Sequence, residues 1–150
     1  MIYKFADKYY FLSNFFVDEI KYKGKSYQSL EHAYQSQKTT SDSEHDWIKN
    51  APTPEKAKYF GKKIKIRKDW DDVKLDIMLN LIRIKFEKPE LKKLLLETGN
   101  EELVEGNYWH DNTWGNCTCV NCKTIEGKNH LGKILMKVRQ EIRDEIELFK

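Results

Sequence analysis

The sequence has no apolar run close to the roughly 20 residues that a membrane-spanning helix needs, and no basic segment followed by an apolar stretch opens it. We therefore expect no membrane contact and no secretory leader, and a protein that stays in the cytoplasm where it is made. Cysteine is scarce: the chain has three, all between positions 117 and 122. An odd, tightly clustered set of cysteines does not suit a disulfide framework. The cysteine pattern therefore favours a reducing compartment.

Neither sign of charge dominates the composition. Lys and Arg number 27 against 24 Asp and Glu, which gives a net charge of +3 at pH 7. This balance suits an anionic ligand but falls short of the strongly basic character of a nucleic-acid-binding protein. A chain of 150 residues with 39% hydrophobic and 34% charged residues is typical of a globular protein with one core. We expect a single domain over residues 1–150.

Apolar periodicity and capping residues predict a mainly α fold with a small β-hairpin near the N-terminus. Lys23-Gly24 marks the turn of the hairpin, Ser29 is a plausible N-cap, and Thr53-Pro54 is a typical helix start. The predicted elements are short strands or a packed loop at residues 2–16, the hairpin at 16–27, helices at 29–38, 53–61, 69–86, 89–99 and from 130 onward, and a loop or short irregular helix at 39–52.

Helical spacing also predicts the core. The side chains expected to be buried are Trp70, Val73, Ile77, Met78, Leu81, Ile82, Leu91, Leu94, Leu95, Leu131, Ile134, Leu135, Val138, Ile142 and Ile146. The apolar stripe of the last helix could serve a core or a dimer, and we expect the core; the oligomeric state is not predicted.

The helix predicted at residues 29–38 carries polar side chains where a surface helix normally buries aliphatic ones. Positions i, i+3, i+4 and i+7 of one face are Glu31, Tyr34, Gln35 and Lys38. One interpretation is a solvated face. The other is the lining of a cleft, in which partial burial shifts the pKa values of the acid and the amine and readies them for proton transfer or nucleophilic attack.

Residues 101–129 are too polar and glycine-rich for a buried element. A connection of this length without regular structure is more often functional than idle. Ten of its residues, 105–114, hold two acids and two indoles, namely Glu105, Asp111, Trp109 and Trp114. The alternative is a surface loop held in place by its tryptophans.

A series of short motifs runs through almost the whole chain in a fixed order. They are Leu12-Ser13-Asn14-Phe15; Glu31-His32-Ala33-Tyr34-Gln35 with Lys38; Trp70 with Met78 and Lys85-Phe86; Thr98-Gly99; Leu103-Val104-Glu105; Asp111 with Trp114-Gly115; and Gly127-Lys128-Asn129-His130-Leu131-Gly132 followed by Leu135-Met136 and Arg139. Together they resemble the NADAR or YbiA-like family of N-glycosidases.

The resemblance implies a compact, single-domain, mainly helical YbiA-like fold. It also implies a hydrolase that cleaves the N-glycosidic bond between ribose phosphate or ADP-ribose and a base. Members of the family are associated with early intermediates of riboflavin biosynthesis, which are ribosylamino-pyrimidine phosphates, or with ADP-ribosylated guanine. The expected partner is therefore a nucleotide or ribosylamine phosphate, or an ADP-ribosylated nucleic acid, and the resemblance does not choose between them.

Cleavage of a ribosyl C–N bond passes through an oxocarbenium-like state, so it needs a carboxylate near the anomeric carbon and an acid that protonates the departing base. We expect Glu31 to act at the sugar and Glu105 or Asp111 to transfer the proton or activate water. Lys38 suggests a second route, in which its amine forms a Schiff base with the sugar. A phosphate contact is the alternative role for Lys38.

Further residues are candidates for substrate binding. The set consists of Asn14, Tyr34, Gln35, Trp70, Trp109, Trp114, Gly115 and Asn129. The tryptophans could stack on the base or belong to the core, and Trp70 keeps the period of its helix, as a core residue would. The two asparagines could bond ribose hydroxyls or phosphate oxygens, or be cap or turn residues.

The cluster of Cys117, Cys119 and Cys122 departs from the simplest family pattern, which needs no thiols. Together with His110 or His130 the cysteines could complete a tetrahedral zinc site. The usual zinc pattern has two separated pairs of ligands, so our expectation is no metal and no cofactor.

An alternative function is a non-catalytic nucleotide- or nucleic-acid-binding module, with or without cysteine-bound zinc. It would use a basic strip formed by Lys62, Lys63, Lys65, Arg67 and Lys68. The strip alternates with isoleucines, as the exposed face of a strand or turn would.

Overall fold

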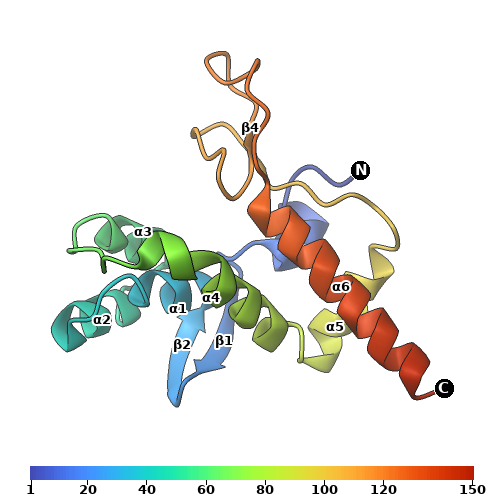
Figure 1. Cartoon of the computed structure of the whole chain (residues 1–150), viewed down its shortest axis with the longest axis horizontal. Helices are drawn as coiled ribbons and strands as arrows, with labels where there is room; N and C mark the ends of the chain where they lie inside the picture. The colour runs from blue at the N-terminus through green and yellow to red at the C-terminus, as the bar shows by residue number, and fades with distance from the viewer. The chain divides into compact units, whose positions relative to one another are not determined.

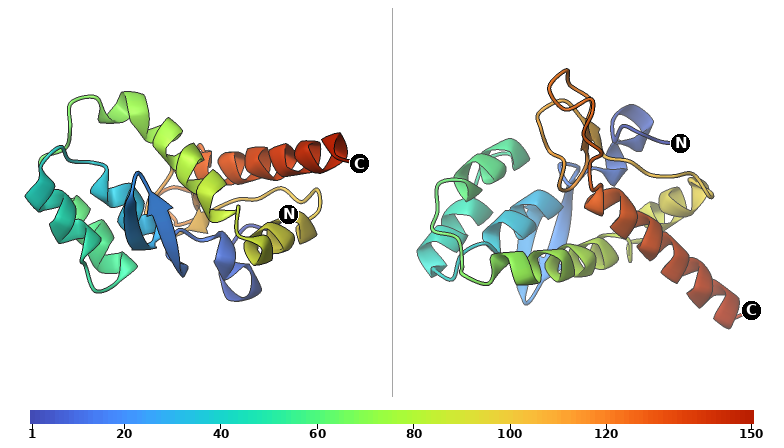
Figure 2. Two further views of the ribbon diagram at one scale, coloured as in Figure 1. Left: turned by 90° about the horizontal axis from the view of Figure 1, so that it is seen from below. Right: turned by 45° about the horizontal axis from the view of Figure 1, so that its top comes forward.

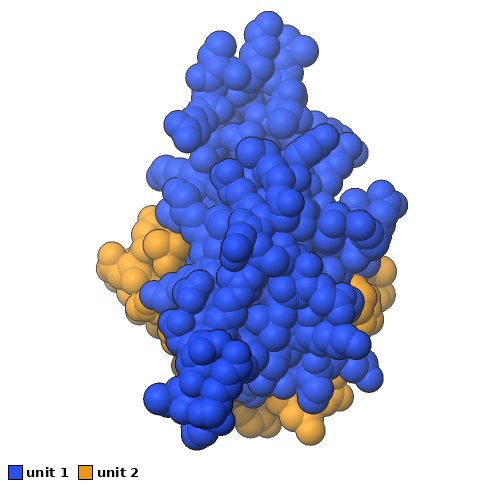
Figure 3. Space-filling view, turned by 90° about the vertical axis from the view of Figure 1, so that its right-hand side faces the viewer, with its two compact units in different colours: residues 1–13, 86–150 blue, residues 14–85 orange.

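The computed structural model describes residues 1–150 and contains six α-helices, one 3-10 helix and four short strands (Figure 1). About 49% of the chain is helical, which confirms the expected mainly α fold with a small N-terminal hairpin. The chain forms two compact units, coloured separately in Figure 3. One is residues 14–85, and the other joins residues 1–13 to 86–150. No helix is both long and apolar enough to cross a bilayer.

The unit of residues 14–85 begins with the predicted hairpin. Strands β1 (Val17–Tyr22) and β2 (Lys25–Ser29) pair antiparallel, with a bulge after Val17. Lys23 and Gly24 form the turn with φ values of 49° and 81°. Two consecutive residues with positive φ are what a type I′ turn requires, and this explains the glycine.

Four helices follow: α1 (Leu30–Ser36), α2 (Asp42–Lys49), α3 (Pro54–Gly61) and α4 (Trp70–Lys85). The predicted caps of α1 and α3 are present, because the Ser29 hydroxyl accepts from the His32 amide at 3.2 Å and the Thr53 hydroxyl accepts from the Lys56 amide at 3.1 Å. Helix α1 contacts both strands and the other three helices. As a result every residue from Leu30 to Ser36 is buried.

Helix α2 is more regular than the sequence suggested. Ser41 caps it by accepting from the Glu44 amide at 3.3 Å, and only Ile48 of its eight residues is buried. With so little apolar surface the segment carries almost no periodic signal. Its buried residue joins Ala51, Ala57 and Ile64 in a small core on which Phe60 packs.

The other unit contains η1 (Asp7–Leu12), α5 (Pro89–Glu97), β3 (Gly106–Asn107), β4 (Asn116–Cys117) and α6 (His130–Leu148). Strands β3 and β4 pair parallel, and Ile2 bridges to Leu103. The long connection that contains β3 and β4 gathers at the N-terminal end of α6 (Figures 1 and 2). Most of this connection is irregular, as predicted.

Two apolar residues predicted to be buried are exposed. Leu94 is 38% exposed and Ile146 is 44% exposed. Helix α5 is short and buries only a narrow stripe with Leu91 and Leu95, and every residue of α6 from Asp144 onward is exposed. Residues 2–16, for which we predicted strands or a packed loop, instead contain the 3-10 helix η1.

Candidate functional site

The helical part of the polar stripe is buried, which excludes the first of the two interpretations, a solvated face. Glu31, Tyr34 and Gln35 are only 6%, 4% and 4% exposed. Lys38 follows the end of the helix and is half-buried. We call these four residues, together with Asn14, the Glu31 cluster.

Two polar oxygens of this cluster have no hydrogen-bond partner. The Gln35 Nε2 donates to Glu31 Oε1 at 2.8 Å, but the Gln35 Oε1 is unpartnered. The Asn14 Nδ2 donates to the Met78 sulfur at 3.6 Å, and the Asn14 Oδ1 is likewise unpartnered. A buried acceptor left unpaired costs about 1–3 kcal/mol, so such atoms call for a ligand or water that donates to them.

Helix α3 ends directly against the side-chain amide of Gln35. A Cβ atom added to Gly61 would lie 2.0 Å from the Gln35 Oε1 and 2.9 Å from the Gln35 Cδ. The glycine therefore allows α3 to approach α1 closely and confines the side chain that bonds Glu31.

Burial lowers the pKa of Lys38 below its ordinary value. The Glu31 carboxylate opposes this shift, and the charges of Lys58, Lys62 and Lys74 add to it. The Lys38 Nζ lies 5.9 Å from the centre of the Tyr34 ring. Burial and the neighbouring cations thus favour the neutral form of the Lys38 amine, the Glu31 carboxylate opposes this, and the cations also favour the binding of an anion.

Two other side chains of this unit are packed structurally. Trp70 is 7% exposed, and its ring centre lies 5.2 Å from that of Tyr34. His32 is fully buried between the Ser29 hydroxyl, at 2.7 Å from Nδ1, and the Ala51 carbonyl, at 3.0 Å from Nε2. Burial lowers the pKa of His32, so its ring is a neutral connector.

The second unit holds a separate polar group around Asn107, which sequence reasoning missed. The Asn107 Nδ2 donates to the Glu105 Oε2 at 3.2 Å and to the Asp111 carbonyl at 2.8 Å, while its Oδ1 accepts from the Asp111 amide at 3.1 Å. Its position in the sequence between the two acids was the only available signal. We call Glu105, Asn107, Asp111, Gly115 and Asn129 the Asn107 cluster.

The members of the Asn107 cluster orient one another. Asp111 Oδ1 accepts from the amides of Thr113 and Trp114 at 3.1 and 2.8 Å, which is the pattern of a turn-forming aspartate. A Cβ on Gly115 would lie 2.0 Å from the Glu105 backbone carbonyl oxygen and 2.0 Å from the Glu105 Oε2. Glycine is therefore required beside this carboxylate.

The Asn129 side chain bonds the backbone of residues 103–105. Its Oδ1 accepts from the Glu105 amide at 3.0 Å and its Nδ2 donates to the Leu103 carbonyl at 2.9 Å. Its backbone is left-handed, with φ of 50°, and its side chain makes no capping bond to α6. Asn129 thus fixes the backbone at Glu105.

The two tryptophans of the connection differ in exposure. Trp109 is 48% exposed and meets Tyr108 edge to face, with ring centres 5.3 Å apart. Trp114 is half-buried and meets His130 in the same manner at 6.1 Å. The exposed face of Trp109 is the one better suited to stacking on a base.

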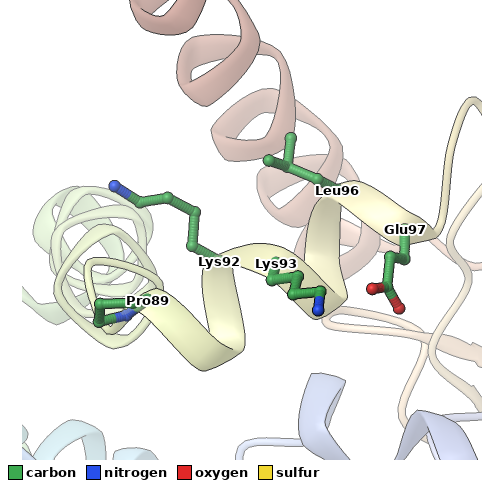
Figure 4. A pocket seen from close by; sticks show the side chains of 5 residues that line it. All are labelled: Pro89, Lys92, Lys93, Leu96 and Glu97. Carbon is green, nitrogen blue, oxygen red and sulfur yellow. The ribbon is translucent and has the colours of Figure 1, made fainter.

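A surface depression of about 500 Å³ follows α5 and contains none of these residues (Figure 4). Its lining consists of Pro89, Lys92, Lys93, Leu96 and Glu97. The two lysines extend in different directions, and the lining offers a single carboxylate. We therefore assign no chemistry to this depression.

Comparisons with known proteins agree with one another. The family model described as the NADAR domain matches residues 2–143. An N-glycosidase of Nostoc punctiforme is 38% identical over 152 residues, which cover 97% of this chain and 94% of that protein. The N-glycosidase YbiA of Escherichia coli is 34% identical over 150 residues, covering 95% and 88%.

The NMR structure of E. coli YbiA superposes with a TM-score of 0.81 at 34% identity, covering 96% of this chain and 84% of that one. A riboflavin biosynthesis protein of Vibrio vulnificus is 32% identical over 137 residues, which cover 89% of this chain but 36% of the longer protein.

Proposed function

Because this chain belongs to the NADAR domain family and is a hydrolase acting on N-glycosyl bonds, we propose that its substrate is a phosphorylated ribosylamine, in which ribose phosphate or ADP-ribose is joined to a base. The observation that carries the proposal is the buried acid and the half-buried lysine of the Glu31 cluster, with the charges of further lysines acting on that lysine. The riboflavin-related name of one relative favours ribosylamino-pyrimidine phosphates as the first substrates to test.

Glu31 is the acid assigned to the sugar. A developing oxocarbenium ion is positive, and a carboxylate removed from water stabilises it more strongly than a solvated one. The Gln35 amide bond holds Glu31 in one orientation. The unpartnered oxygens of Asn14 and Gln35 are suited to accept from ribose hydroxyls.

On a second route, which bypasses the oxocarbenium ion, Lys38 takes a covalent role. A ribosylamine opens to an imine, and the neutral form of the Lys38 amine, which burial favours, can exchange with it. The exchange releases the free amine of the base and leaves an imine between Lys38 and C1 of the sugar. Water then adds, which regenerates the lysine and releases ribose phosphate. Lys58, Lys62 and Lys74 are assigned to the phosphate. Burial supports the covalent role of Lys38 because it lowers the pKa of the amine.

Of the two acids in the other unit, we assign proton transfer to Glu105 and a positioning role to Asp111. The Asp111 Oδ1 is already occupied by two backbone amides. The Glu105 carboxylate is instead oriented by an Asn107 side-chain amide and by the space left at Gly115.

The test is incubation with ribosylamino-pyrimidine phosphates and, separately, with ADP-ribosylated guanosine, followed by mass spectrometry of the products. We expect release of free base, and loss of about 10²–10⁴-fold in Glu31→Gln. Turnover of Glu105→Gln should fall by a comparable factor. Lys92→Ala on α5 is the control and should keep its turnover. Unchanged turnover in Glu31→Gln would overturn the assignment of this residue.

Borohydride added during turnover tests the covalent route. We expect a trapped adduct on Lys38 and none in Lys38→Arg, which keeps the charge but cannot form the imine. If Lys38→Arg stays active and no adduct is found, Lys38 is a phosphate contact.

A further inference from the structure

Four metal-ligating side chains converge in the connection between α5 and α6. They are His110, Cys117, Cys119 and Cys122, and their ligand atoms all lie within 4.8 Å of one another. The three cysteines of the set are all the cysteines of the chain, and they come from one loop. None of the roles proposed above uses them.

The spacing of these atoms fits one tetrahedral ion. Zn–S bonds of about 2.3 Å and Zn–N bonds of about 2.0 Å place neighbouring ligand atoms about 3.5–3.8 Å apart. The His110 Nδ1 lies 3.4 Å from the Cys122 sulfur and 3.4 Å from the Cys119 sulfur. His130, the other histidine considered from the sequence, instead meets the Trp114 ring.

Backbone groups already support the cluster. The His110 amide donates to the Cys117 sulfur at 3.3 Å, a bond that stabilises a thiolate. The Cys117 amide donates to the Asn112 Oδ1 at 2.8 Å. His110 itself has a left-handed backbone, with φ of 69°, which turns its ring toward the cysteines.

The loop has little apolar packing to hold it. Between residues 117 and 128 only Cys117 and Cys122 are buried, while Val120 and Ile125 are 79% and 51% exposed. An apolar core therefore does not account for its conformation, whereas a bound ion would cross-link it.

We propose that His110, Cys117, Cys119 and Cys122 form a structural zinc site. Four protein ligands fill the tetrahedron and leave no position for water or substrate, so the ion stabilises the loop and takes no part in hydrolysis. Binding converts three thiols to thiolates and releases three protons. The site fixes the segment in which the Thr118 amide donates to the Asn107 carbonyl at 2.7 Å, and so steadies the Asn107 cluster.

The first test is elemental analysis of protein purified under reducing conditions without added zinc. We expect about one zinc per chain, and loss of the zinc in His110→Asn and Cys119→Ser. His130→Asn is the matched control, since it removes the alternative histidine and should leave the zinc content unchanged.

Cobalt(II) gives a second readout on the intact protein after the zinc is removed by a chelator. We expect the intense visible bands of tetrahedral cobalt and a near-ultraviolet thiolate band that weakens in Cys119→Ser. The proposal fails if the purified protein holds no zinc and cobalt gives no such bands. It also fails if His110→Asn keeps its zinc, if iron occupies the site, or if the cysteines prove to be disulfide-bonded. The cobalt titration decides the matter even where a variant does not fold.

Discussion

The protonation of Lys38 should respond to its charged neighbours in both directions. Glu31 raises the pKa of Lys38 while burial and the charges of Lys58 and Lys62 lower it. Substitutions of these neighbours should therefore move the pKa of one amine in opposite directions, which is a sharper expectation than a loss of activity.

We predict that Glu31→Gln lowers the pKa of Lys38 further and that Lys62→Ala raises it. The measurement is competitive labelling of lysine amines over a range of pH, read for Lys38 by mass spectrometry. Lys63→Ala is the control, because Lys63 is adjacent to Lys62 but is not among the groups that shift Lys38. Shifts of the same sign in both variants would contradict the arrangement described.

Side-chain roles were only partly predictable from the sequence. The stripe of Glu31, Tyr34, Gln35 and Lys38 follows from helical spacing, but its burial depends on five elements that close around α1. Asn107 was missed because its bonds run to a carboxylate and to backbone groups, which leave no pattern in the sequence. The choice of His110 over His130 likewise needed the conformation of the loop.

Helix α3 influences the cluster through its last residue. Gly61 leaves room for the Gln35 amide, and Gln35 in turn bonds Glu31. A methyl group at this position can only be accommodated if Gln35 moves or α3 shifts away.

We predict that Gly61→Ala destabilises the fold by about 1–3 kcal/mol, the usual cost of overpacking, and lowers kcat. Denaturant unfolding and steady-state kinetics measure the two effects. The double variant Gly61→Ala with Gln35→Ala should recover most of the stability but not the activity, because the crowded amide is gone while Glu31 loses its donor. Full activity in the single variant would show that Gln35 does not position Glu31.

Elements with local signals were predicted well. The Lys23-Gly24 turn and the caps at Ser29 and Thr53 are dictated by neighbouring residues and are present. Helix α2 was predicted only as a loop or a short irregular helix, because it buries a single residue. The burial of Ile146 near the end of α6 was wrongly predicted, because a sustained apolar period does not reveal where the packing partner stops. Both errors arise from tertiary packing rather than propensity.

Charge over the molecule bears on the alternative function, a nucleic-acid-binding module. The net charge is only +3. Within the basic strip, the Arg67 guanidinium bonds both carboxylate oxygens of Asp69 and donates to the Gln37 carbonyl at 3.5 Å. One of the five cations is thus already engaged, which weakens the strip as a surface for phosphates.

We therefore predict that polynucleotide binding is weak and falls steeply with salt, while hydrolysis of a small substrate persists. Exposed cations are screened within about 8 Å at physiological ionic strength, whereas half-buried lysines such as Lys38 are screened less. Binding measured by fluorescence anisotropy, and KM measured over the same salt range, test this. Lys65→Ala should reduce the residual binding without raising KM, since Lys65 is exposed and is not among the lysines that act on Lys38. Tight binding at physiological salt that depends on Lys65, with no hydrolysis of either substrate, would favour the binding module, because the strip and not the buried acid would then carry the function.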